Sequence, residues 1–149
     1  MSTTIQETKD TVALLKECDA GTKMAVKSIR QVMDDTSSEK LNALLSEALQ
    51  EHEKLGNDLH TLLKEYGEEG QEPPLMGTMG SWITTSVKMM VDDSDHQIAS
   101  LMIDGCNMGI KSLSEYMNEY KEASSKAEDM CTRLITIEQD LADKLRLFL

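Results

Sequence analysis

Four residues of types that bind metal ions interrupt helical patterns that are otherwise apolar. They are Asp19, His52, Cys106 and Glu138. A buried ionisable side chain is costly unless it is paired or bound to a metal, so each of these positions needs a partner. A carboxylate, an imidazole, a thiolate and a second carboxylate, brought together, would suit iron or zinc. The first interpretation is therefore a metal site inside a helical bundle.

The same four residues also fit an arrangement without a metal. Asp19 and His52 would then form a hydrogen-bonded pair, and Cys106 would be a small core residue. Glu138 would lie at the edge of its apolar stripe and reach solvent. Both interpretations bring Asp19 and His52 together, so both depend on how the helices that carry them are arranged.

Apolar residues recur at steps of three and four along most of the chain, which predicts long amphipathic helices. We expect helices over residues 4–34, 37–66, 94–122 and 125–148, and a short amphipathic helix over 81–91. Only 3% of residues are aromatic, whereas 11 are Met. Such a core favours helices, because strands are enriched in aromatic and β-branched residues.

Three local signals set the expected ends of these helices. Thr36 with Glu39, and Ser125 with Glu128, have the spacing of capping boxes that begin a helix. Gly67 follows the second helix and is expected to end it.

The inward-facing stripe of each helix follows from the same periodicity. The expected stripes are Thr8, Val12, Leu15, Asp19, Thr22, Val26, Ile29 and Met33; Leu41, Leu45, Ala48, His52, Leu55, Leu59, Leu62 and Tyr66; Ala99, Met102, Cys106, Gly109, Leu113, Tyr116 and Tyr120; and Cys131, Leu134, Glu138, Leu141, Leu145 and Phe148. In the third helix, a register through Gly105 and Met108 fits almost as well and would turn Cys106 sideways.

Pro73 and Pro74, with glycines on both sides, divide the chain into two helical hairpins. The long link between the hairpins can return along the bundle, which makes the second and third helices parallel, as in the ferritin-like chain path. An up-down-up-down bundle is the alternative. Asp19 and His52 are equally distant from the first turn, and Cys106 and Glu138 are within about one helical turn of each other. We therefore predict an all-α four-helix bundle, a single domain over residues 1–149, with these four residues at one level.

Three segments carry a resemblance that covers nearly the whole chain: ECDAGTKMA, EHEKLGNDLHTLLKEYG and GTMGSWITTSVKMMVDDSDHQIASLMIDGCNMGIKSL. With them the chain resembles the ferritin-like superfamily, and most closely a bacterial group of uncharacterised ferritin-like proteins. Iron-oxidising members of the superfamily use a Glu on two helices and Glu-x-x-His on the other two. Here Leu49 stands three residues before His52, and the last helix contains no His. The resemblance therefore implies the fold with a degenerate mid-bundle site.

The formal net charge is −12, which disfavours binding to nucleic acids and to anionic membrane surfaces. Three widely spaced cysteines do not suggest a disulfide framework, and neither a signal peptide nor a membrane-spanning run is evident. We expect a cytoplasmic, non-enzymatic structural or protein-interaction module that self-associates as a homodimer. The alternative is a metal-binding protein that holds iron or zinc at the four residues.

Overall fold

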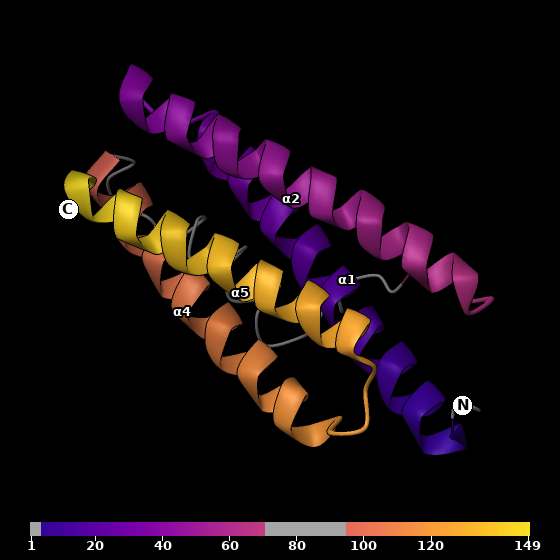
Figure 1. The fold of residues 1–149 in the computed structure, drawn as a ribbon. Coiled ribbons are helices and arrows are strands. Elements are labelled where there is room, and N and C mark those ends of the chain that lie inside the picture. Colours follow the sequence, from indigo (N-terminus) through magenta and orange to yellow (C-terminus); the bar gives the residue numbers. More distant parts are fainter. Residues whose placement is uncertain (1–3, 71–94) are drawn as a thin grey trace.

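The computed structural model describes residues 4–70 and 95–149, and the part of the chain it describes folds into four long helices (Figure 1). They are α1 (Ile5–Met33), α2 (Glu39–Glu65), α4 (Asp95–Glu119) and α5 (Ser125–Leu145), and the 3-10 turn η1 (Arg146–Phe148) follows α5. The four long helices and the all-α class are as predicted. The short helix predicted over residues 81–91 lies outside the described residues. None of the described helices is long and apolar enough to cross a membrane.

Hydrogen bonds at the two ends of the bundle define the chain path. At one end, the carboxylate of Asp95 accepts hydrogen bonds from the backbone N–H groups of Ser37 and Ser38, both at 2.9 Å. The first turn of α4 therefore lies beside the start of α2, and the two helices run parallel. This is the ferritin-like path, and the up-down-up-down alternative is wrong.

The opposite end of the bundle joins the start of α1 to the turn between α4 and α5. Asp10 accepts a hydrogen bond from the N–H of Glu122 at 2.9 Å, and the hydroxyl of Thr11 accepts one from the N–H of Ser124 at 2.8 Å. Helices α1 and α5 therefore begin at the same end and run parallel. Figure 1 shows the two antiparallel hairpins, α1 with α2 and α4 with α5, side by side.

The two predicted capping boxes are wrong by one or two residues. Helix α2 is capped by Ser38, whose hydroxyl accepts from the N–H of Leu41, and α5 is capped by Ser124, whose hydroxyl accepts from the N–H of Ala127. Thr36 instead donates to the carbonyl of Met33 at 3.0 Å. The N–H groups of Ser38 and Ser124 are each held by a side chain from another helix, and this tertiary contact decides where each helix begins.

Helix α2 ends at glycine as predicted. Gly67 has φ +71°, a conformation that favours glycine. The N–H of Gly67 donates to the carbonyl of Lys64 at 2.9 Å, and the N–H of Glu68 donates to that of Leu63 at 3.0 Å. The backbone then passes close to α1, since a Cβ added at Gly70 would lie 2.5 Å from Oδ2 of Asp19.

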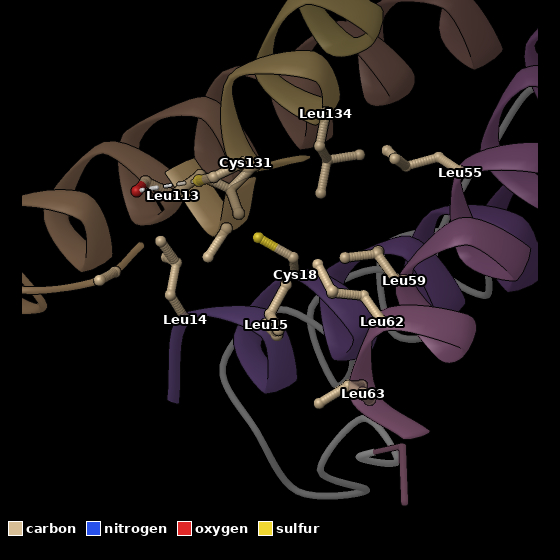
Figure 2. Packing of buried hydrophobic residues seen from close by; sticks show 12 residues of the cluster. Leu14, Leu15, Cys18, Leu55, Leu59, Leu62, Leu63, Leu113, Cys131 and Leu134 are labelled. Atoms are coloured by element: carbon tan, nitrogen blue, oxygen red, sulfur yellow. Dashed lines mark hydrogen bonds between the residues drawn. The ribbon is translucent and has the colours of Figure 1, made fainter. Parts of the chain in front are cut away.

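The core consists of two apolar clusters, one toward each end of the bundle. The first includes Leu14, Cys18, Leu55, Leu59 and Leu134, shown in Figure 2, and the second includes Ile29, Leu45, Ala99, Cys106 and Leu141. The stripe predicted for α2 is buried along its length except at Tyr66, which is exposed, and the stripe predicted for α5 is buried up to Leu145. In α4, Cys106 is buried, so the first of the two registers is correct.

The stripe predicted for α1 is wrong at its first two positions. Thr8 is exposed and Val12 is half-buried, whereas Thr11, Leu14 and Cys18 are buried. The reason is that α1 packs against three helices, α2, α4 and α5. It therefore buries a wider face than the narrow seam of a coiled coil.

Replacing Asp95 tests the parallel arrangement of α2 and α4. We expect Asp95→Ala to lower the free energy of unfolding by about 1–2 kcal/mol, because two backbone donors at the start of α2 lose a charged acceptor. Chemical denaturation measures the change. Asp104→Ala, at an exposed position on the same helix, is the matched control and should stay within about 0.5 kcal/mol of the wild type. Equal losses of stability in the two variants would contradict the parallel arrangement of α2 and α4.

Candidate functional site

His52 is the centre of the polar cluster inside the bundle. Its side chain is completely buried, and both ring nitrogens are hydrogen-bonded within the chain. Nδ1 lies 2.7 Å from the carbonyl oxygen of Ala48, one turn earlier on α2. A carbonyl can only accept, so Nδ1 carries the proton. Nε2 is hydrogen-bonded to the carboxylate of Glu138 on α5.

The surroundings of His52 act on its pKa in opposite directions. Burial is the largest influence and lowers the pKa, whereas the hydrogen bond and the charge of Glu138 raise it, helped by Ala48 and Glu51. The net result is a pKa above the ordinary value of 6.5. A raised pKa in the folded state means that protonation of His52 stabilises the fold. This contribution is complete below about pH 6.5 and is lost as the pH rises through the folded-state pKa.

Cys106 on α4 completes the cluster. Burial raises the pKa of its thiol strongly, and the charge of Glu138 and a hydrogen bond to Glu138 raise it further. The thiol is therefore protonated at neutral pH, beside the carboxylate of Glu138. His52, Cys106 and Glu138 come from three different helices and meet as predicted, with exposed fractions of 0%, 2% and 8%.

Asp19 does not join this cluster. It is buried on α1 and forms an ion pair with Lys23 at 3.0 Å, next to Gly70. The predicted hydrogen bond between Asp19 and His52 is therefore wrong. The expectation that Glu138 reaches solvent is wrong as well, because Glu138 is buried.

Close packing between α1 and α2 explains the error. A Cβ added at Gly56 would lie 3.5 Å from Cγ2 of Thr22, so these two residues face each other. Because the helices are antiparallel, Asp19 is then level with Leu59 rather than with His52. Seven residues separate Leu59 from His52, which is roughly 10 Å along a helix. Asp19 and His52 are equally distant from the turn in sequence, but this does not place them at the same level. The link between the helices is asymmetric, so α1 and α2 are shifted against each other along their axes.

The side chains of the cluster do not fit the di-iron pattern implied by the resemblance. In the described part of the chain, no group of three or more His, Cys, Asp or Glu side chains is arranged to hold a metal ion. Both nitrogens of His52 are occupied, and a metal ligand needs a free lone pair on one of them. The neighbouring acidic residues Glu51 and Asp104 are exposed. What the arrangement can do chemically is hold a proton between His52 and Glu138.

A second pair of reactive side chains was missed by the sequence analysis. Cys18 on α1 and Cys131 on α5 are both completely buried, and each thiol shifts the pKa of the other. Cys131 Sγ also lies 3.7 Å from the carbonyl oxygen of Leu113 (Figure 2). Cys131 was in its predicted stripe, but Cys18 was not. The run of Thr11, Leu14 and Cys18, at steps of three and four, is the signal that could have revealed it.

No protein-family model and no curated protein has significant similarity to the sequence. Several solved structures, by contrast, share its fold. A conserved hypothetical protein of Mycobacterium tuberculosis superposes with a TM-score of 0.72 at 16% identity, covering 95% of this chain and 98% of its own. YcfI, described as a putative structural protein from Rhodopseudomonas palustris, has a TM-score of 0.72 at 16% identity, covering 98% of this chain and 97% of its own.

A third similar structure is Dps from Thermosynechococcus elongatus, with a TM-score of 0.69 and 16% identity. The match covers 94% of this chain and 90% of the Dps chain. At this identity the similarity concerns the fold alone. The fold that the resemblance implies is thereby confirmed: the chain has the fold of the ferritin-like helical bundles.

Proposed function

We propose that this protein is a non-enzymatic structural or protein-interaction module. The observation that carries the proposal is that the polar residues inside the bundle bond to one another. One nitrogen of His52 is hydrogen-bonded to the carbonyl of Ala48 and the other to Glu138, and the protonated thiol of Cys106 lies beside Glu138. No atom of His52 is left to bind a substrate, because both ring nitrogens are hydrogen-bonded and the ring is completely buried. The description of the Rhodopseudomonas neighbour as a putative structural protein agrees with this proposal.

The module is further proposed to act as a homodimer through its C-terminal turn. Leu147 is 88% exposed and Leu149 is 59% exposed, on either side of the half-buried Phe148. We call these three residues the C-terminal patch. Large apolar side chains exposed to water favour association, because contact between the patches of two chains removes apolar surface from solvent.

Sedimentation velocity over a range of concentrations tests the homodimer. The full chain should sediment as a dimer, and Leu147→Gln with Leu149→Gln should sediment as a monomer, because glutamine keeps the bulk but loses the apolar contact. Ile5→Gln is the matched control, since Ile5 is 78% exposed at the start of α1, at the opposite end of the bundle from the C-terminal patch. This control should remain dimeric. If the wild type is still a monomer at about 100 μM, the proposed homodimer is contradicted. The Kd of the dimer would then lie above this concentration, which corresponds to weak association.

Metal binding at the same cluster is the second candidate. It is favoured by one observation, the meeting of His52, Cys106 and Glu138 from three helices. Zinc and iron both accept imidazole, thiolate and carboxylate ligands. A metal ion would have to replace the proton between His52 and Glu138 and would have to deprotonate Cys106.

Elemental analysis of untagged, freshly purified protein separates the two candidates. The structural proposal predicts iron, zinc and manganese far below one per chain, even after supplementation of the growth medium. It also predicts that His52→Ala changes none of these values. About one metal ion per chain that is lost in His52→Ala would overturn the structural proposal in favour of a metal site.

A further inference from the structure

Cys18 and Cys131 lie on neighbouring parallel helices, in the same apolar cluster. Both are completely buried. In Figure 2, the sulfur of Cys18 points from α1 toward the segment of α5 that carries Cys131. We propose that these two thiols form a reversible intramolecular disulfide under peroxide, which links the first long helix of the chain to the last.

The anchoring of the two helix starts explains why the cysteines are level. The hydroxyl of Thr11 accepts a hydrogen bond from the N–H of Ser124, which fixes one residue of α1 beside the cap of α5. Cys18 is seven residues beyond Thr11, and Cys131 is seven residues beyond Ser124. Two parallel helices that start together and advance seven residues reach the same height, roughly 10 Å from the anchor. Seven residues are also about two helical turns. Cys18 therefore lies on the same face of α1 as Thr11, and Cys131 lies on the same face of α5 as Ser124.

The two thiols have different roles in the oxidation. Their mutual interaction raises the pKa of Cys18 and lowers the pKa of Cys131. The thiolate is the reactive form of cysteine, so Cys131 attacks the peroxide. Its sulfur takes one peroxide oxygen as the O–O bond breaks, which gives a sulfenic acid and one water molecule. The sulfur of Cys18 then attacks that of Cys131. The S–S bond forms, the S–O bond breaks, and the proton of Cys18 leaves with the hydroxyl as a second water.

Cys106 provides a control within the same molecule. It is as deeply buried as the other two, but its neighbour is the carboxylate of Glu138, which disfavours the thiolate. No second cysteine is hydrogen-bonded to it. Cys106 should therefore remain a thiol while Cys18 and Cys131 become linked.

The test treats the folded, full-length protein with hydrogen peroxide. The protein is then denatured, its free thiols are alkylated, and its peptides are mapped by mass spectrometry without reduction. We expect a peptide pair joined through Cys18 and Cys131, two hydrogen atoms lighter than the separate peptides, and an alkylated Cys106. Cys106→Ala should give the same linked pair, and Cys131→Ser should give none. A chain oxidised after denaturation serves as the control for the oxidant.

Thermal unfolding of the oxidised protein provides the second readout. A disulfide that encloses most of the chain should raise the Tm by roughly 5–15 °C, and a reductant should reverse the rise. Absence of the Cys18–Cys131 link in the folded protein would overturn the proposal if the denatured chain forms disulfides under the same conditions. A link that involves Cys106, or a Tm that falls on oxidation, would overturn it as well, because either result requires the helices to leave their observed positions.

Discussion

The hydrogen bond between His52 and Glu138 crosses the centre of the bundle and connects α2 to α5. It lies where the two apolar clusters meet. On α2, His52 stands between Ala48 of one cluster and Leu55 of the other, and on α5, Glu138 stands between Leu141 and Leu134 in the same way. An ionisable pair in this position is costly to bury, and the cost is offset only when every polar atom has a partner.

The surrounding structure supplies those partners. The carbonyl of Ala48 fixes the orientation of the imidazole, and the protonated thiol of Cys106 on α4 lies beside the carboxylate. In the described residues, every fully buried side-chain nitrogen and oxygen has a hydrogen-bond partner. Loss of one member of such a pair typically costs about 3–5 kcal/mol, because the remaining group is left buried without compensation. A shift of α5 by one turn against α2 would carry a comparable cost, so the pair selects one register of these two helices.

The sequence was sufficient to predict the elements and the inward positions that make this pair. Along α2, the apolar periodicity identified every buried position from Leu41 to Leu62, including His52. The periodicity of α5 identified Glu138 in the same way. These predictions succeeded because each of the two helices has one dominant apolar face, and a single face can be inferred from local spacing.

The partner of His52 could not be predicted by the same means. Pairing depends on the relative heights of helices, and the contact between Thr22 and Gly56 shows that the height of α1 against α2 does not follow from equal distances to the turn. Asp19 was therefore assigned to the wrong level. The contact between Cys18 and Cys131 was missed because α1 buries a wide face against three helices, whereas the prediction assumed a narrow one. Both errors concern tertiary geometry, which residue spacing along one helix does not contain.

The most direct test of this account is the NMR titration of the imidazole of His52. The exposed residues His60 and His96 provide reference signals in the same sample. The account predicts a protonated Nδ1 at every pH at which the chain is folded, and a midpoint above 6.5 for His52. In Glu138→Gln the midpoint should fall below 6.5, because burial, which is already the largest influence, is then no longer opposed by the charge of Glu138. A wild-type midpoint at or below 6.5, or a midpoint that Glu138→Gln leaves unchanged, would contradict the account.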